Sequence, residues 1–472
     1  MDDMQNVDIA AEAQHNVIGV QANAERSASF KRTTHPDAQW FENAGLGLFI
    51  HWGISSVHGG IDISWSMMLN STWDLEYEGK NKITPAEYFK LADKFNPENY
   101  DPDKWIRAAA DAGFRYAILT TKHHDGYALW PSEYSDFCTG THMGGRDLLK
   151  PYVDACRKYG LKVGFYYSPP DWHFNKDYYS FDLKDFKVVE DKRKQEIQGY
   201  DVNHKLVVIP SKPEEFHNKY KEYIRNQVKE LLTRYGKIDI MWFDGCPEVI
   251  SIDEIREFQP GIVVNPRMHG YGDFESPECE LPKERPAGWW EACLIWNYHE
   301  WGYQEPHGYR PTGWMLNLLA RCRAWKGNLL MNCAPKGDGT MPDIYYERMK
   351  ELAEWMKYGK ESVFNIEPGP YPEKSNVPVT IKDNTWYLHM LPEEDDIKGR
   401  SWYLHLLVPG KEARSYPVEM KTAKLLGVQK PKVVKLLRTG EEIPYKYDNS
   451  ELAISINADK CTQLDDVVAV IW

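Results

Sequence analysis

Seven short apolar runs, separated by amphipathic helical stretches, constrain the fold of this chain more than any other feature of its sequence. The runs are rich in β-branched and aromatic residues, which is typical of buried strands. They are Leu46–Trp52, Tyr116–Thr121, Leu161–Tyr167, Ile238–Asp244, Ile262–Asn265, Ala292–Trp296 and Asn328–Asn332. Repeated strand–helix units predict a parallel sheet. Seven strands fit an α/β fold of the (β/α)8 barrel type, irregular or with one strand not visible in the pattern, better than a doubly wound sheet.

The intervening stretches carry helix signals. The segment Pro102–Ala112 has Asp101 as a plausible N-cap and a proline in its first turn. Glu214–Tyr235 and Asp343–Tyr358 are longer and charged on one face. By contrast, Trp172–Lys212 is charged and poorly periodic, so we expect an insertion beside the barrel mouth.

The pattern changes after about Val363 to short strand-like runs separated by turn residues. The runs are Trp386–Met390, Ser401–Leu407, Ala423–Leu425, Lys432–Leu437 and Val467–Trp472. They predict a C-terminal β-sandwich. We therefore expect three parts: a poorly structured N-terminal leader at 1–36, a catalytic barrel at 37–362 and the sandwich at 363–472.

Composition excludes several classes of function. The chain of 472 residues has a formal net charge of −13, which disfavours binding to nucleic acid. No apolar stretch reaches the roughly 18 residues of a membrane span, so we expect no membrane partner. The eight cysteines form no CxxC pair and predict neither a disulfide scaffold nor a zinc site.

The N-terminal segment carries no apolar core of a signal peptide. We expect a secreted, periplasmic or lysosome-like protein whose signal has been removed, with a cytoplasmic location as the alternative. A homo-oligomeric state is left open.

Three predicted strands end in clusters of residues whose side chains can bind a ligand or take part in catalysis. The clusters are His51-Trp52-Gly53, Lys122-His123-His124-Asp125-Gly126 and Trp242-Phe243-Asp244-Gly245. In a barrel, the carboxyl ends of the strands converge on one pocket. Three such ends in one chain indicate a functional site rather than three unrelated turns.

A glycosidase needs one carboxylate to attack the anomeric carbon and another to protonate the leaving oxygen. Asp244, at the end of a strand with aromatic neighbours, suits the first role. Glu275, Glu278 and Glu291 are acidic candidates near the same mouth, and spacing alone does not choose among them.

A metal site at His51, His123 and His124 is not favoured, because adjacent strand residues point to opposite sides and no HxH or HExxH pattern is present. Hydrogen bonds from these histidines to sugar hydroxyls are the better interpretation. No GxxxxGK[ST] or GxGxxG motif suggests a nucleotide site. No metal and no cofactor are expected.

The order and spacing of several motifs resemble glycoside hydrolase family 29, the α-L-fucosidases. The motifs are Trp40-Phe41, Gly45 to Gly53, Phe89 to Phe95, Lys122 to Gly126 with Leu129-Trp130, Gly164 to Ser168, Trp242 to Gly245, Val264 to Arg267, Trp290-Glu291, Trp301 to Tyr303, Gly327 to Asn332 and Asp338-Gly339. The resemblance covers about residues 37 to 360. It implies a barrel followed by a β-sandwich, retention of anomeric configuration by double displacement, and a fucosylated oligosaccharide or glycoconjugate as substrate.

The resemblance also implies roles for individual residues. The nucleophile falls on Asp244, and the general acid/base falls on Glu278, with Glu291 as the alternative. The substrate-binding residues are His51, Trp65, His123, His124, Tyr166, Trp242, Arg267 and Trp290.

The chain departs from the family in two places. Members often have Glu-Trp-Tyr where this chain has Ser64-Trp65-Ser66, and the loop after Asp244 is short. Both departures bear on substrate specificity. An exo-α-L-fucosidase is the expected function. The alternatives are an α-L-galactosidase, whose sugar differs by a hydroxyl on C6, and a non-catalytic fucose-binding protein.

Overall fold

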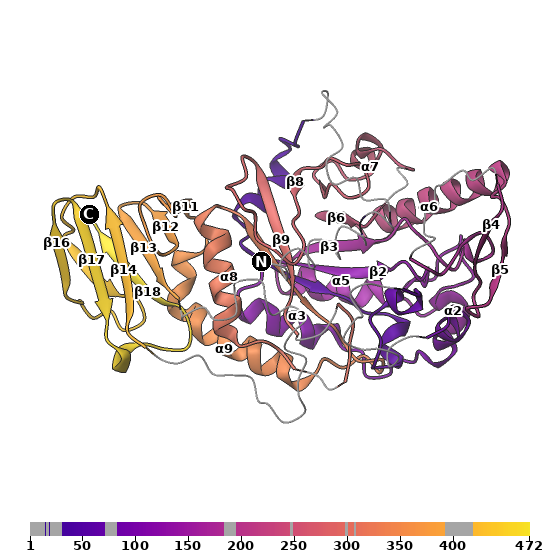
Figure 1. Cartoon of the computed structure of the whole chain (residues 1–472), viewed down its shortest axis with the longest axis horizontal. Helices are drawn as coiled ribbons and strands as arrows, with labels where there is room; N and C mark the ends of the chain where they lie inside the picture. Colours follow the sequence, from indigo (N-terminus) through magenta and orange to yellow (C-terminus); the bar gives the residue numbers. More distant parts are fainter. Residues whose placement is uncertain are drawn as a thin grey trace.

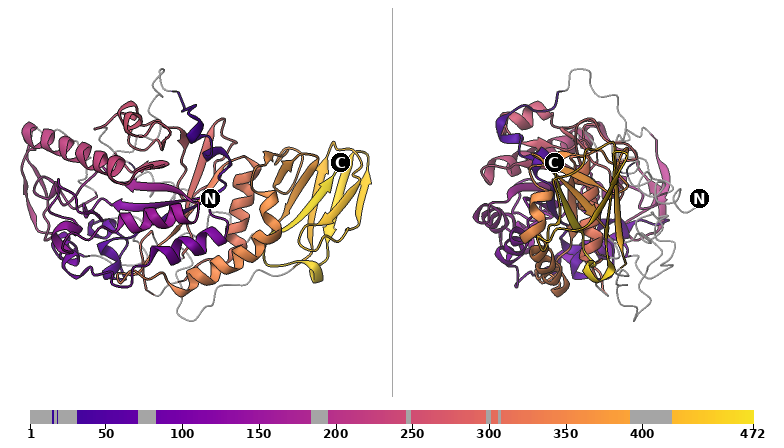
Figure 2. Two further views of the ribbon diagram at one scale, coloured as in Figure 1. Left: turned by 180° about the vertical axis from the view of Figure 1, so that it is seen from behind. Right: turned by 90° about the vertical axis from the view of Figure 1, so that its left-hand side faces the viewer.

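Two bodies of secondary structure make up the molecule, a parallel barrel and a pair of antiparallel sheets (Figure 1). The computed structural model describes residues 15, 18, 31–70, 83–183, 195–245, 249–297, 301–305, 308–391 and 419–472. Helices α8 (Thr312–Ala324) and α9 (Asp343–Gly359) lie between the barrel and the C-terminal sheets, as Figure 1 and the left view of Figure 2 show.

The barrel is an eight-stranded sheet with the order β7-β6-β3-β2-β1-β10-β9-β8, and its paired neighbours are all parallel. Its strands are β1 (Leu46–Ile50), β2 (Tyr116–Lys122), β3 (Lys162–Tyr167), β6 (Ile240–Phe243), β7 (Val263–Val264), β8 (Phe274–Glu275), β9 (Trp289–Ile295) and β10 (Asn328–Cys333). The predicted barrel is confirmed. The strand that the sequence did not signal is β8, because glycine and polar neighbours leave no apolar run around Phe274. The equally short β7 lies in the apolar run Ile262–Asn265.

The barrel is nearly closed between β7 and β8. The backbone N–H of Asp273, next to β8, donates to the carbonyl of Val264 at 2.8 Å. The N–H of Val264 in turn donates to the Asp273 carboxylate at 2.9 Å, and Arg256 pairs with the same carboxylate. A side chain thus supplies hydrogen bonds that a longer β8 would make through its backbone.

The described helices are α2 (Pro85–Phe89), α3 (Pro102–Asp111), α4 (Thr139–His142), α5 (Leu149–Lys158), α6 (Glu214–Arg234), α7 (Ile252–Phe258), α8 and α9. Helices α3, α6 and α9 follow the three predicted segments, and the other described helices were not singled out in the sequence. The 3-10 turns are Pro36–Ala38, Phe41–Asn43, Ile54–Val57, Ser64–Met67, Lys90–Lys94, Lys176–Tyr178, Lys360–Ser362 and Ala458–Lys460. As expected, the Asp101 side chain caps α3 by accepting from the N–H of Lys104.

The described part of the predicted insertion contains a hairpin of β4 (Ile197–Tyr200) and β5 (Leu206–Ile209). At the start of the insertion, the N–H of Trp172 donates to the carbonyl of His124 at 2.7 Å. The Trp172 ring also contacts the Trp65 ring, with centroids 5.2 Å apart. The segment therefore supports the loops at the barrel mouth.

The C-terminal region folds into two antiparallel sheets. The first consists of β11 (Glu367–Pro368), β12 (Val379–Lys382), β13 (Thr385–Met390), β18 (Asp466–Ile471) and β15 (Val433–Leu436). The second consists of β14 (Lys421–Leu426), β17 (Glu451–Ile456) and β16 (Tyr445–Asp448). Alternate residues of both sheets form a hydrophobic core of their own, as a sandwich requires.

Two of the sequence predictions are not decided by these sheets. The expected strand Ser401–Leu407 lies outside the described residues. The boundaries at 36/37 and 362/363 stay predictions. Contacts do cross the second boundary, since the indole N–H of Trp355 in α9 donates to the carbonyl of Asp465 at 2.8 Å.

Two further sequence expectations concern membranes and cysteines. Within the described ranges, no helix combines the length and the apolar character needed to cross a membrane. The seven cysteines that the structure describes all have free thiols.

The close packing of β1 against β2 predicts that Gly47→Ala lowers the stability of the barrel. A Cβ at Gly47 in β1 would lie 2.1 Å from the ring of Tyr116 in β2, and Tyr116 is fully buried. We expect the variant to lose roughly 2 kcal/mol or more of unfolding free energy, measured by urea denaturation. Gly288→Ala is the control, because its Cβ would meet only Arg32 at 3.7 Å. Equal midpoints for the two variants would contradict the expectation.

Candidate active site

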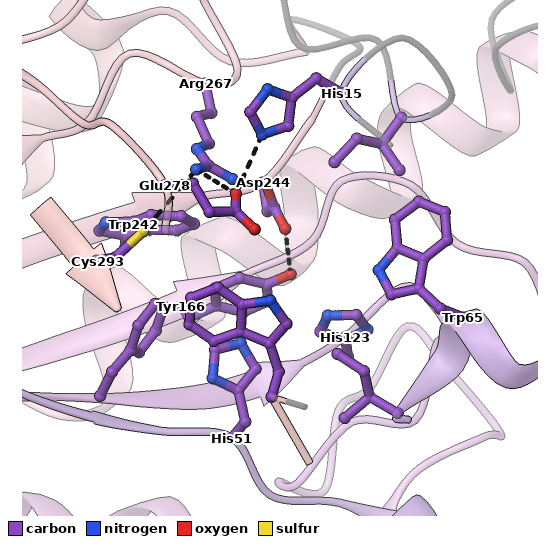
Figure 3. Close-up of a pocket in the computed structure, with 14 residues that line it drawn as sticks. His15, His51, Trp65, His123, Tyr166, Trp242, Asp244, Arg267, Glu278 and Cys293 are labelled. Atoms are coloured by element: carbon purple, nitrogen blue, oxygen red, sulfur yellow. Dashed lines mark hydrogen bonds and ion pairs between the residues drawn. The ribbon is translucent and has the colours of Figure 1, made fainter. Parts of the chain in front are cut away.

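A pocket of about 360 Å³ opens at the carboxyl ends of the barrel strands (Figure 3). It is lined by His15, Ile18, Phe49, His51, Ile63, Trp65, His123, Tyr166, Trp242, Asp244, Arg267, Glu278, Cys293 and Trp301. The structure thus brings together eight of the predicted site residues. They come from β3, β6 and the loops that follow β1, β2, β6, β7 and β8.

Asp244 lies immediately after β6, where the strand delivers its side chain into the pocket. The Tyr166 hydroxyl donates to Oδ2 of Asp244 at 2.7 Å. Burial and the charge of Asp244 hold the pKa of Tyr166 well above its ordinary value, so the phenol keeps its proton. Nε2 of His124 lies 3.6 Å from the same oxygen. The Tyr166 hydroxyl therefore orients the carboxylate, while the Asp244 side chain stays 11% exposed.

Arg267, in the loop after β7, bridges two carboxylates. Its Nη1 donates to Oδ1 of Asp244 at 3.0 Å, and its Nη2 donates to Oε2 of Glu278 at 2.6 Å. The guanidinium carbon lies 4.6 Å from the ring centroid of Trp242, in cation–π contact. One guanidinium thus ties Asp244 and Glu278 to the same wall of the pocket, as Figure 3 shows.

Glu278 is held by the loop between β8 and β9. An isolated β-bridge pairs it with Cys293 of β9, and the N–H of Cys279 donates to the Cys293 carbonyl at 2.9 Å. Burial raises the pKa of the Glu278 carboxyl, but the charge of Arg267 and the hydrogen bonds from His15 and Arg267 outweigh it. The net pKa is held well below its ordinary range, so Glu278 is a carboxylate in this arrangement.

The three predicted histidines are neutral. Burial lowers the pKa of His51 and of His124 to about 4, and it holds that of His123 well below its ordinary value. A neutral imidazole offers one donor and one acceptor, which suits a sugar hydroxyl.

The hydrogen-bond networks fix the proton position on two of these rings. Asn332 donates to the Trp301 carbonyl at 2.8 Å, so its Oδ1 faces His51 and accepts from Nδ1 at 2.7 Å. Ser168 donates to the Pro170 carbonyl at 2.7 Å, so its oxygen accepts from Nδ1 of His124 at 2.6 Å. Both rings therefore carry the proton on Nδ1 and present a lone pair at Nε2. Nε2 of His124 has no hydrogen-bond partner among the described residues.

His123 and His124 do not point apart, contrary to the expectation from strand geometry. Their rings lie 4.1 Å apart, because both follow the end of β2 and strand alternation does not apply in the loop. With Asp244 they form a group whose ligand atoms lie within 4.8 Å of one another. The Arg267 guanidinium on Asp244 disfavours a cation there, since like charges repel. Nδ1 of His123 is hydrogen-bonded to Ser64, one of the residues at which the chain departs from the family that it resembles.

Three predicted site residues, His124, Trp290 and Glu291, are not among the residues that line the pocket. His124 is fully buried beside Asp244. Trp290 points outward to α8, where its indole N–H donates to the Trp325 carbonyl at 3.1 Å. Glu291 faces the barrel interior, fully buried, and accepts from Tyr116 and from the Trp242 indole. Burial raises the pKa of Glu291 to about 7. The two side chains alternate along β9, and the pocket begins at Cys293, two residues further on.

Six lining residues were not among the predicted site residues: His15, Ile18, Phe49, Ile63, Cys293 and Trp301. Two had a signal in the sequence. Phe49 is two residues before His51 and so shares its strand face, and Trp301 belongs to a motif of the family resemblance. His15 and Ile18 fall in the segment expected to be a poorly structured leader, and nothing in the sequence pointed to them.

Paired carboxylates at the mouth of a parallel barrel are what attack on a glycosidic bond requires. Fold and site together define the chain as a glycoside hydrolase, and comparison with known proteins narrows the class. A family model described as alpha-L-fucosidase matches residues 13–361. The chain belongs to the α-L-fucosidase family, glycoside hydrolase family 29, as its motifs predicted.

The relatives agree with this assignment. Tissue alpha-L-fucosidase of Bos taurus is 27% identical over 379 residues, covering 75% of this chain and 73% of the relative. Alpha-L-fucosidase isoenzyme 1 from Paenibacillus thiaminolyticus superposes with a TM-score of 0.71 at 29% identity, covering 92% of this chain and 98% of that one. The structure of Thermotoga maritima alpha-fucosidase in complex with a mechanism based inhibitor superposes with a TM-score of 0.66 at 26% identity. The match covers 93% of this chain and 97% of that one.

Proposed function

We propose that this chain is a retaining exo-α-L-fucosidase with Asp244 as nucleophile and Glu278 as general acid/base. The observation that carries the proposal is the single guanidinium of Arg267 that spans both carboxylates in one pocket. Retaining enzymes keep their two carboxyl groups about 5–5.5 Å apart, whereas inverting enzymes leave room for a water molecule between them. A shared arginine favours the short separation.

The reaction proceeds in two displacements. Asp244 attacks the anomeric carbon of α-L-fucose while Glu278 protonates the glycosidic oxygen, and a covalent β-fucosyl-enzyme forms. Glu278 then takes a proton from water, which attacks the anomeric carbon and releases Asp244. Two inversions return the α configuration. His51, which lines the pocket, accepts from a sugar hydroxyl, with His123 and Tyr166 beside it. His124, buried beside Asp244, is proposed to accept through its unpartnered Nε2.

Glu278 is the better acid/base than Glu291. A pKa of about 7 would suit Glu291 for acid catalysis, but its carboxyl group is inside the barrel, hydrogen-bonded to Tyr116 and Trp242. A catalytic acid must first be within hydrogen-bond reach of the leaving oxygen, and its pKa comes second. Glu278 lines the pocket and Glu291 does not.

The low pKa of Glu278 imposes a condition on substrate binding. As a carboxylate paired with Arg267, Glu278 has no proton to give. Productive binding therefore draws Arg267 away from Glu278, for instance toward a sugar oxygen, and lets burial raise the pKa. In the second step the carboxylate form is the one required.

The apolar part of the pocket supports fucose over L-galactose. Phe49, Ile63, Trp65 and Trp301 contribute apolar surface, which suits the C6 methyl group of fucose. A fucosylated glycan is the partner that follows from this. Linkage preference, homo-oligomer formation and a secreted, periplasmic or lysosome-like location stay predictions.

Two aryl glycosides test the proposed function. We expect the enzyme to release p-nitrophenol from the α-L-fucoside at least about ten times faster than from the matching α-L-galactoside, since an added hydroxyl in an apolar pocket costs about 1–3 kcal/mol. NMR during hydrolysis should show α-L-fucose as the first product. First release of the β anomer would exclude double displacement. Faster cleavage of the galactoside would make the chain an α-L-galactosidase, and binding without turnover would make it a fucose-binding protein.

A further inference from the structure

Two residues of the N-terminal segment, His15 and Ile18, reach the active site. His15 and Ile18 are both helical and both line the pocket, although Asp244 and Glu278 lie more than 220 residues further along the chain. Residues three apart on a helix share a face, so the two side chains point the same way. Figure 3 shows His15 above Glu278, on the side opposite His51.

His15 contacts Glu278 directly. Its Nε2 lies 3.0 Å from Oε2, and because a carboxylate can only accept, Nε2 carries the proton and donates. Arg267 donates to the same oxygen at 2.6 Å. Oε1 has no hydrogen bond from the residues that the structure describes. One oxygen of Glu278 is thus anchored twice, and the other is available to a leaving group.

Ile18 packs beside the proposed nucleophile. Its side chain is 2% exposed, and its carbonyl oxygen lies 2.4 Å from the place where a Cβ on Gly245 would sit. Gly245 directly follows Asp244 and has a φ of +95°, so a side chain there is disfavoured twice. The main chain of Ile18 therefore approaches this glycine closely, in the same pocket as His15.

We propose that His15 is a positioning residue for Glu278, holding Oε2 so that Oε1 faces the glycosidic oxygen. The inference rests on the proposed acid/base role of Glu278. When substrate draws Arg267 away, His15 is the donor that remains on Oε2. A glutamate side chain turns about three bonds, and a shift of about 1 Å is enough to weaken proton transfer severely.

Leaving-group dependence separates this role from a merely structural one. Phenyl α-L-fucoside needs a proton on its departing oxygen, whereas 2,4-dinitrophenyl α-L-fucoside does not. For His15→Ala we expect kcat/KM to fall about tenfold on the phenyl fucoside and less than about twofold on the dinitrophenyl fucoside, a part of the 10²–10⁴ that acid catalysis supplies. His15→Gln should restore most of the loss, because its amide can donate to Glu278. His58→Ala, at an exposed histidine outside the pocket, is the matched control.

The rates on the two fucosides decide whether His15 positions Glu278. Equal losses on both fucosides would mean that His15 shapes the pocket as a whole, which overturns the inference. Unchanged rates on both fucosides would overturn it as well. If the unsubstituted enzyme cleaves neither fucoside, the proposed function itself fails, and the wild-type rates reveal this before any variant is compared.

Discussion

Replacing Asp244 with asparagine is expected to lower kcat/KM for an aryl α-L-fucoside by roughly 10³- to 10⁵-fold, or about 4–7 kcal/mol of transition-state stabilisation. The amide has the shape of the carboxylate and can still accept from Tyr166 at the same position. The neutral amide is a poor nucleophile toward the anomeric carbon, so the first displacement is lost while the geometry of the site is kept. Steady-state kinetics measure the effect.

Azide distinguishes a lost nucleophile from a damaged pocket. In Asp244→Gly, azide can occupy the vacated space and attack the α-fucoside once, so the expected product is β-fucosyl azide. Asp253→Asn makes the same change as Asp244→Asn at an exposed position in α7 and should leave kcat/KM unchanged. Full activity of Asp244→Asn, or α-fucosyl azide from the glycine variant, would remove Asp244 from the nucleophile role.

The second large effect is expected for Glu278→Ala. Loss of the acid should reduce kcat/KM by about 10²–10⁴ for phenyl α-L-fucoside and far less for the dinitrophenyl analogue. Azide should now intercept the β-fucosyl-enzyme and yield α-fucosyl azide, the anomer opposite to the one from the nucleophile variant. Rate measurements on both substrates, together with the anomer formed, identify the residue as acid/base.

Glu291→Gln is the comparison that decides between the two glutamates. Because Glu291 is buried against Tyr116 and Trp242, we expect lower stability and no change in leaving-group dependence. A steep leaving-group dependence in Glu291→Gln, with none in Glu278→Ala, would reverse the assignment.

The fold was predictable where its signals are local. Strands such as β2 and β3 are continuous apolar runs, and α3 carries its cap and its first-turn proline. The two-residue β8 has no such signal, because its place depends on the side chain of Asp273 bonding to Val264. That interaction belongs to the tertiary structure and leaves no periodic mark.

The candidate site was predictable to the extent that it lies on strand ends. Asp244, His51 and His123 follow from strands that converge on one mouth, whereas Tyr166 followed only from the family resemblance. His15 does not, since its role depends on the long-range return of a segment with no pattern of its own. Trp290 illustrates the opposite difficulty, because a residue in a family motif can pack on the outside of the barrel. Only its position along β9 shows whether it faces the pocket or the surrounding helices.

The proton positions on His51 and His124 have a consequence for the sugars that the enzyme can recognise. With these residues as hydroxyl-binding groups, each Nε2 lone pair needs a free O–H from the sugar. A methyl ether or sulfate ester at that oxygen has lost the hydrogen, and a deoxy sugar leaves the nitrogen buried without a partner. Under the proposed function, Asn332 and Pro170, which set these protons without lining the pocket, would make it selective for unsubstituted fucose.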